Sequence, residues 1–329
     1  MGIDIKYKSK KNIPEIYNFK RIDRCTAEGD VDYSMPVLIF PQMENECPGI
    51  NHFFSTRIGG VSSGDQASLN FSYKMDSDEK CVLENFERAA AFFGCRASDI
   101  VGTDQTHTAT VRVVDKKDAG HGVTIPKSFF DVDGLVTNDP DVILFVTCAD
   151  CVPILFADPI NKVVAAVHSG WRGTCAGIAV NALNIMTQQF GCDAKNIHVA
   201  IGPSICKDCY EVSDDLYQAF SVSPAYSEIS LQDIFEKKPI DGIKGEKLQN
   251  ESCGDSKDGF HDNSCGVNRV KYQLDLWRAN ELILLNAGVD PHNIEVTDAC
   301  TFCNSDILFS HRASKGKRGG MGAFIKIEK

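Results

Sequence analysis

The sequence lacks the features that would place the protein in a membrane, outside the cell or on nucleic acid. No apolar run approaches the roughly 18 residues that suggest a membrane span. Residues 1–19 carry four lysines but no apolar core, which predicts no secretory signal, and Lys6 stands where a myristoylation signal has Ser or Thr. Basic side chains number 34 against 45 acidic, and the net charge of −11 opposes nonspecific attraction to nucleic acid or anionic membrane. We therefore expect a cytoplasmic protein.

A Pro/Ser-rich linker is also lacking, although 329 residues exceed the length of a typical domain. We therefore predict a partly ordered N-terminal extension over residues 1–50 and one domain over 51–329, with hydrophobic residues, 43% of the chain, to fill its core. Only residues 221–270 look like an insertion, because they are polar and rich in glycine. Metal binding there would use the side chains of Cys253, His261 and Cys265. We interpret the segment as a solvated loop instead.

The 14 cysteines are numerous, yet a long chain without a signal peptide is expected to keep them reduced. Three pairs have Cys-x-x-Cys spacing: Cys148 with Cys151, Cys206 with Cys209, and Cys300 with Cys303. This spacing allows structural zinc or a redox pair. The first pair, however, straddles the most informative stretch of the chain, and no conventional ribbon order links the other two. We interpret these other four as buried reduced thiols.

That stretch, residues 147–153, contains Cys148, Asp150 and Cys151, and His168 follows seventeen residues after Cys151. Apolar runs bounded by turn signals predict buried strands over residues 142–146, 152–157 and 163–167. A thiol, a carboxylate and an imidazole thus stand near the ends of buried strands, where packing would favour none of them. The pattern indicates an active site.

A helix is predicted after the third strand, from Thr174 as N-cap to about Phe190, because apolar residues recur there at helical spacing. The turn at residues 168–173 therefore offers free backbone N–H groups and the positive end of a helix dipole, with Arg172 beside them. Such a turn suits an anion, and phosphate is the obvious candidate. Two further amphipathic helices are predicted over residues 79–93 and 274–286.

Several short blocks together resemble one family. They lie, in chain order, at residues 104–107 (Asp-Gln-Thr-His), 131–137, 149–154, 168–173 (His-Ser-Gly-Trp-Arg-Gly) and 201–205. They resemble the polyphenol-oxidase or laccase-domain family, also called YfiH-like, which is regarded as containing purine nucleoside phosphorylases with adenosine deaminase activity. The resemblance covers about residues 53–327. It implies an α/β fold, a single domain with a mixed β-sheet flanked by helices, which the alternating strand and helix patterns permit.

The resemblance also implies a metal site made by His107, Cys151 and His168, which match the family's ligands one by one. Two imidazoles and a thiolate suit zinc, and three protein ligands leave one tetrahedral position open for water. Zinc can lower the pKa of that water from 15.7 to about 7, as deamination of adenosine to inosine requires. Copper accepts the same ligand types.

Purine nucleosides and inorganic phosphate are the implied partners, and no obligate protein partner is expected. Phosphorolysis of adenosine, inosine and 5′-methylthioadenosine would release the free base and ribose 1-phosphate or its methylthio derivative. The candidate phosphate-binding side chains are Arg57, Arg172 and Arg312, because guanidinium pairs bidentately with phosphate. Near the C-terminus the family has paired arginines after a Phe-Ser step, whereas this chain keeps only Arg312 there.

Three carboxylates near the predicted metal site are candidates for proton transfer or substrate binding: Asp131, Asp133 and Asp150. Two other readings of the site stay open. A copper polyphenol oxidase is the weaker one, because only eight histidines are scattered through the chain, whereas a multicopper oxidase needs many. The other is a metal-free hydrolase or deamidase that uses Cys151 as nucleophile and His168 as base.

Overall fold

The computed structural model describes residues 3–8, 15–23, 31–75, 78–238 and 270–329. Most of its strands form two large mixed sheets, and the first has the strand order β1-β2-β3-β15-β7-β4. All neighbours in this sheet are antiparallel except β7 and β4. Its strands are β1 (Glu15–Asp23), β2 (Val31–Ile39), β3 (Ile50–Ser55), β15 (Met321–Ile327), β7 (Ile143–Cys148) and β4 (Ile100–Gly102).

The second large sheet has the order β14-β10-β8-β9-β6-β5, and only its outer pairs are parallel. Its strands are β14 (Ile294–Val296), β10 (His198–Ile201), β8 (Val152–Asp158), β9 (Val163–Ser169), β6 (Gly134–Thr137) and β5 (Val111–Val113). A small antiparallel third sheet has the order β11-β13-β12. It consists of β11 (Glu211–Ser213), β13 (Lys271–Leu274) and β12 (Phe235–Lys237).

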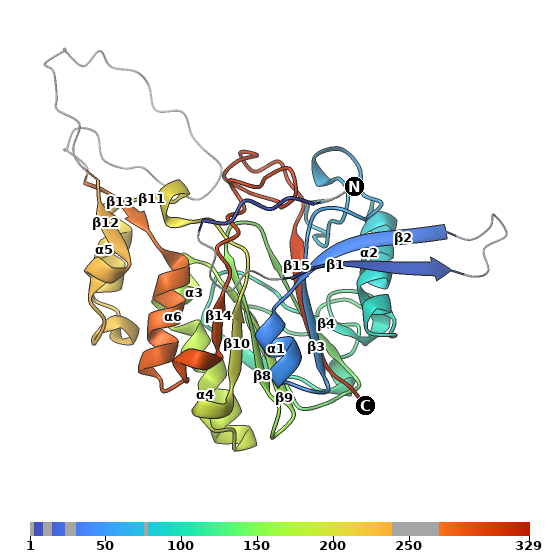
Figure 1. Cartoon of the computed structure of the whole chain (residues 1–329), viewed down its shortest axis with the longest axis horizontal. Coiled ribbons are helices and arrows are strands. Elements are labelled where there is room, and N and C mark those ends of the chain that lie inside the picture. The colour runs from blue at the N-terminus through green and yellow to red at the C-terminus, as the bar shows by residue number, and fades with distance from the viewer. Residues whose placement is uncertain (1–2, 9–14, 24–30, 76–77, 239–269) are drawn as a thin grey trace, which may run out of the picture.

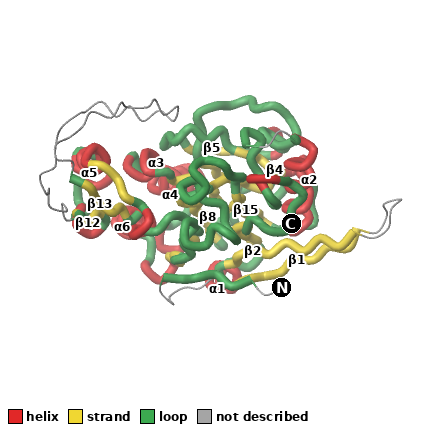
Figure 2. The backbone as a smooth tube through the Cα atoms, turned by 90° about the horizontal axis from the view of Figure 1, so that it is seen from above, coloured by secondary structure: helices red, strands yellow, loops and turns green. Residues whose placement is uncertain are grey.

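Helices cover the outer faces of the two large sheets, so the body has an α/β/β/α arrangement (Figure 1). The helices are α1 (Pro41–Glu46), α2 (Glu79–Phe92), α3 (Trp171–Cys175), α4 (Ile178–Phe190), α5 (Asp214–Ser221) and α6 (Leu276–Asn286). On one side α2 packs on the first sheet, and on the other α4 and α6 pack on the second. The third sheet and α5 lie beyond α6, while β1 and β2 project from the opposite side (Figures 1 and 2). The predicted α/β class is confirmed, with the strands divided among three sheets.

The three predicted buried strands are confirmed as β7, β8 and β9. Successive side chains of a strand point to opposite faces, and both faces of these strands are buried, so that their sequences are continuous apolar runs. In β8, Ile154 and Phe156 pack toward the helices, whereas Leu155 and Ala157 pack into the core between the two large sheets. Because both faces are buried, each strand carries apolar side chains in both directions.

One predicted helix is corrected in detail. The stretch expected as a single helix from Thr174 is α3 followed by α4, and Thr174 lies inside α3 rather than capping a helix. The break falls at Gly177, whose φ of 74° is left-handed, a conformation that glycine adopts without steric strain. The helices predicted over residues 79–93 and 274–286 are confirmed as α2 and α6, with ends shifted by one or two residues. Among the described helices, none is long and apolar enough to cross a membrane.

The first part of the segment predicted as a polar insertion, residues 221–238, packs on the domain core. Residues up to 238 include β12 and the buried side chains of Tyr226, Ile234 and Phe235, which pack into the same core as α4 and α6. Residues 239–269, with the three potential ligands expected there, lie outside the described residues. At the other end of the chain, residues 31–46 form β2 and α1.

Candidate active site

The three predicted metal ligands come together where the two large sheets meet. His168 lies in β9 opposite Pro153 of β8, and Cys151 directly precedes β8. His107 comes from the loop after β4 of the other sheet. The Cys151 Sγ lies 3.8 Å from His107 Nε2, and the ligand atoms of all three residues lie within 4.8 Å of one another. Together they form a group that could hold a metal ion.

A buried carboxylate, Asp133, organises this group. It accepts hydrogen bonds from the backbone N–H groups of Thr106, His107 and Thr108, at 3.2, 3.1 and 2.8 Å, and from the Thr108 hydroxyl at 2.8 Å. It also lies 2.8 Å from Nδ1 of His168. A carboxylate only accepts, so Nδ1 carries a proton, and Nε2 is the ring nitrogen that could bind a metal ion after losing its own proton. Asp133 therefore holds both histidines in position for metal binding.

Electrostatics favour the ligating form of the thiol. Burial raises the pKa of Cys151, but the charge of His168 and hydrogen bonds from His107 and His168 outweigh it and lower the pKa to about 6. Burial lowers the pKa of His168, and the Cys151 thiolate together with Asp133 raises it to about 9. Burial likewise opposes ionisation of Asp133, yet hydrogen bonds from His168 and Thr108 leave its pKa below the usual range. Cys151 is thus a thiolate at neutral pH.

The backbone around the group is specialised. Among the described residues, five other than glycine have positive φ, and three of these lie here: His107 at 66°, Asp131 at 56° and Asp150 at 86°. Such strained conformations cluster at functional sites. Gly170 is needed for space, because a Cβ there would lie 2.6 Å from His107 Cδ2 and 3.1 Å from Cys151 Sγ. The sequence alone gave no sign of this close approach.

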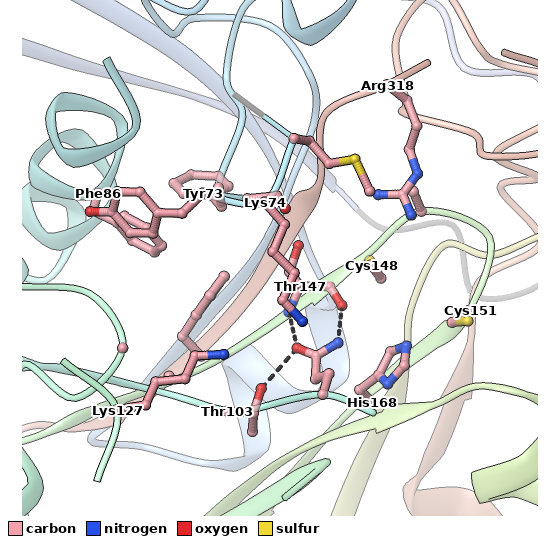
Figure 3. Close-up of a pocket in the computed structure, with 18 of the residues that line it drawn as sticks. Tyr73, Lys74, Phe86, Thr103, Lys127, Thr147, Cys148, Cys151, His168 and Arg318 are labelled. Atoms are coloured by element: carbon pink, nitrogen blue, oxygen red, sulfur yellow. Dashed lines mark hydrogen bonds between the residues drawn. The ribbon is translucent and has the colours of Figure 1, made fainter. Parts of the chain in front are cut away.

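A pocket of about 390 Å³ opens beside the three ligands (Figure 3). Its wall combines aromatic rings with cationic side chains, and His107, Cys151 and His168 all line it. The aromatic residues are Phe71, Tyr73, Phe86 and Phe145, and the cations are Lys74, Lys127 and Arg318. Lys127 forms an ion pair with Asp104. The pocket falls in the size range of small-molecule sites.

Arg318 is the functional candidate that the sequence analysis missed. Its guanidinium is largely buried, so that desolvation lowers its pKa, while the charges of Cys151 and Asp150 act in the opposite direction. Nη1 donates to the Gly319 carbonyl at 3.0 Å, and no described residue accepts from the buried Nε. The sequence feature that could have indicated Arg318 is its place directly before Gly319-Gly320, which lead into the C-terminal strand β15. Arg318 stands six residues after Arg312, the arginine that this chain retains from the family's pair.

The three arginines predicted to bind phosphate do not line this pocket. Arg57 lies in a neighbouring pocket of about 150 Å³, where its Nε and Nη1 donate to the carbonyls of Ala67 and Ser305. Arg172 lies over the ring of Trp171, 4.3 Å from its centroid. Arg312 lies 5.4 Å from the centroid of the Tyr210 ring. Burial and the charge of Cys151 raise the pKa of the Tyr210 hydroxyl, whereas the charges of Arg312 and Arg172 lower it, so both arginines lie within electrostatic range of Tyr210.

The two other predicted carboxylates differ in their surroundings. Asp150 accepts from the Thr301 hydroxyl and from the backbone N–H of Arg312, each at 2.6 Å, so that it holds the segment from 300 to 312 beside the site. Asp131 is exposed and accepts from the Thr106 hydroxyl at 2.7 Å.

The structure also brings together the four thiols of the second and third Cys-x-x-Cys pairs, which were predicted to be buried reduced thiols rather than a structural zinc site. Cys206, Cys209, Cys300 and Cys303 place their sulfur atoms within 4.8 Å of one another. They form a second group that could hold a metal ion.

Comparison with known proteins identifies relatives over most of the chain. Purine nucleoside phosphorylase YlmD of Geobacillus stearothermophilus is 34% identical over 82% of this chain and 88% of its own length. Adenosine deaminase RL5, from an unknown prokaryotic organism, is 31% identical over 79% of this chain and 87% of its own. The crystal structure of the hypothetical protein YfiH of Bacillus licheniformis matches with a TM-score of 0.74 and 27% identity, covering 95% of this chain and 100% of that one. The fold is therefore YfiH-like, as expected.

A family model described as multi-copper polyphenol oxidoreductase laccase matches residues 51–328, which span all three ligands of the first metal group. With relatives above 30% identity along most of its length, the chain belongs to this laccase-domain family.

Proposed function

We propose that the protein is a zinc-dependent purine nucleoside enzyme that phosphorolyses adenosine, inosine and 5′-methylthioadenosine and hydrolytically deaminates adenosine. The observation that carries the proposal is the two-histidine, one-thiol group beside a pocket lined by aromatic rings and cations. Relatives named purine nucleoside phosphorylase and adenosine deaminase support the same chemistry.

The residues present fit a zinc ion. Cys151 is a thiolate at neutral pH, His168 presents Nε2 because Nδ1 donates to Asp133, and the absence of a side chain at Gly170 leaves space beside His107. His107, Cys151 and His168 would hold the ion, and zinc bound there would supply Lewis-acid activation of water. The choice of zinc over copper belongs to the proposal, because copper accepts the same ligand types.

The pocket wall suits both substrates. In phosphorolysis a phosphate oxygen forms a bond to C1′ of the ribose while the C1′–N9 bond breaks and its electron pair leaves with the purine. Arg318 would bind the phosphate dianion, because its buried Nε lacks a partner among the described residues and guanidinium pairs strongly with phosphate. Lys127 and Lys74 add positive charge at the same pocket. The aromatic rings provide an apolar surface for the purine.

The three carboxylates have different roles in this proposal: two position other residues and one transfers a proton. Asp133 keeps a proton on Nδ1 of His168 and does not exchange it with substrate, because five donors surround it. Asp150 positions the segment that carries Arg312. Exposed Asp131 is the candidate for proton transfer to the leaving group.

A second reading rests on one specific observation. The Cys151 thiolate lies beside the His168 imidazolium, which in turn bonds to the Asp133 carboxylate. This is the arrangement of a cysteine nucleophile, its base and the group that orients the base. A metal-free hydrolase or deamidase would use the same side chains.

The test is product analysis with protein of known metal content. Wild type, Cys151→Ala and Arg318→Gln are incubated with each of the three nucleosides, with and without phosphate, and products are separated by chromatography. Arg278→Gln is the matched control, because Arg278 pairs with Glu281 on α6 and lies outside the pocket. We expect phosphate-dependent release of free base that is lost in Cys151→Ala. Arg318→Gln should raise the KM for phosphate about 10- to 100-fold, since a hydrogen bond to a charged group contributes about 1.5–3 kcal/mol.

The possible outcomes separate the readings. Phosphate-independent conversion of adenosine to inosine by zinc-loaded protein supports the deaminase activity. Folded, zinc-loaded protein that leaves all three nucleosides unchanged contradicts the proposal. Metal-free protein that is active and is covalently labelled at Cys151 favours the nucleophile instead.

A further inference from the structure

Four thiols meet at a place that the proposed reaction does not use. Cys206 and Cys209 flank a short turn after β10, and Cys300 and Cys303 flank a turn after β14. The two turns are 94 residues apart in sequence, yet they lie side by side through the bridge between Ser204 and Cys300. All four sulfur atoms lie within 4.8 Å of one another.

The spacing of the sulfur atoms approaches that of a tetrahedral thiolate site. A Zn–S bond of about 2.3 Å corresponds to an edge of about 3.8 Å between sulfur atoms of a regular tetrahedron. Cys209 Sγ and Cys303 Sγ are 3.6 Å apart. Two Cys-x-x-Cys turns that face each other are the arrangement of Cys₄ structural zinc sites.

Backbone donors already point at the sulfur atoms. The N–H of Cys206 donates to Cys300 Sγ at 3.3 Å, and the N–H of Cys303 donates to the same atom at 3.5 Å. Cys300 is completely buried, so these two N–H groups reach it from within the core. Such donors stabilise a thiolate, which is the form that binds metal. Lys8 donates to Asp208, the residue before Cys209, at 3.2 Å.

The two turns support the wall of the candidate active site. Thr301 lies between Cys300 and Cys303 and donates its hydroxyl to Asp150, and the N–H of Ile205 donates to the Asp150 carbonyl at 3.1 Å. Asn304 exchanges two hydrogen bonds with the backbone of Lys6. An ion that joins the two turns would therefore hold both the N-terminal segment at Lys6 and Asp150, the residue before Cys151, in position.

We propose that Cys206, Cys209, Cys300 and Cys303 bind a structural Zn²⁺ ion, separate from the ion at His107, Cys151 and His168. The site is closed, because four thiolates fill a tetrahedral shell and leave no position for substrate or water. Its role is to join the turns after β10 and β14.

The experiment is metal analysis of the full-length protein and of single variants. Cys151→Ala removes a ligand of the first group, Cys303→Ser removes a half-buried ligand of the second, and Cys95→Ser is the control. Cys95 is also half-buried, and a serine there keeps the hydrogen bond to the Phe93 carbonyl. We expect two zinc ions per chain in wild type and Cys95→Ser, and one in each of the other two variants. Failure of the proposed nucleoside reaction would leave these numbers unchanged.

A second measurement does not depend on the folding of Cys303→Ser. Cys151→Ala protein reloaded with Co²⁺ should show the charge-transfer absorption of a tetrahedral cobalt thiolate, because only the four-cysteine group is then intact. Its Tm should fall when a chelator strips the metal. The proposal is overturned if folded Cys151→Ala holds no zinc and shows no such absorption. Iron in place of zinc, or a disulfide between Cys209 and Cys303 in metal-free protein, would overturn it as well.

Discussion

Replacement of Asp133 by asparagine should weaken zinc binding at the candidate active site with almost no change in side-chain volume. The buried carboxylate accepts from His107 N–H and His168 Nδ1 on one oxygen, and from the N–H groups of Thr106 and Thr108 and the Thr108 hydroxyl on the other. An asparagine amide must place its NH₂ group against one of these two sets of donors. At least two donors therefore lose their acceptor in either orientation, and the negative charge opposite His168 disappears.

The size of the effect follows from these contacts. Hydrogen bonds to charged groups contribute about 1.5–3 kcal/mol each, so that loss of two should lower the free energy of unfolding by about 3–6 kcal/mol. For 329 residues with an unfolding entropy of about 2.1 cal/mol/K each, this corresponds to a fall in Tm of about 4–9 °C. Loss of the group that orients a ligating histidine weakens metal affinity about 10- to 100-fold.

The assay is competition for zinc against a chromophoric chelator, together with thermal unfolding. Asp131→Asn is the matched control, because Asp131 is exposed, its carboxylate accepts from the Thr106 hydroxyl at the surface, and its φ of 56° is one that asparagine tolerates. Its zinc affinity should stay within about twofold of wild type. If Asp133→Asn bound zinc as tightly as wild type, the orienting role assigned to Asp133 would be refuted.

Three further predictions concern the site and the core. Gly170→Ala should abolish metal binding by the first group, since its Cβ would lie 2.6 Å from the His107 ring; retention of that metal in the folded variant would contradict the assigned packing. In metal-free protein, alkylation of Cys151 should rise with pH through a midpoint of about 6, while buried Cys148, whose pKa burial raises, stays unreactive; a midpoint near that of an ordinary thiol would argue against the electrostatics of the site. Burial lowers the pKa of His52 to about 3, so between pH 6.5 and 3 the unfolded chain binds a proton that the folded chain does not. The free energy of unfolding should therefore fall by about 1.4 kcal/mol for each unit by which the pH decreases through this window. Chemical denaturation of wild type and His52→Gln over this range tests it, and equal slopes in both would exclude the histidine as the cause.

Which arginines line the pocket could not be predicted from the sequence. Arg57 was expected to bind phosphate, but Ala67 and Ser305 use its Nε and Nη1, and neither contact follows from local sequence. Arg318 reaches the pocket because β15 inserts between β3 and β7 and carries the preceding loop to the site. Sequence motifs identify residue types, whereas strand order decides which of them share a pocket.

Local pattern was sufficient for the strands β7, β8 and β9 and for the helices α2 and α6. The choice of His107, Cys151 and His168 as candidate ligands came from the resemblance to a family, not from the pattern alone. Periodicity and turn residues act over a few positions, and metal ligands carry their chemistry in the residue type. Only the tertiary structure decided that Asp133 would orient His168 and that two cysteine pairs 94 residues apart would meet. These contacts depend on how strands are ordered and sheets are packed, which is set by the burial of the whole core and not by any single segment.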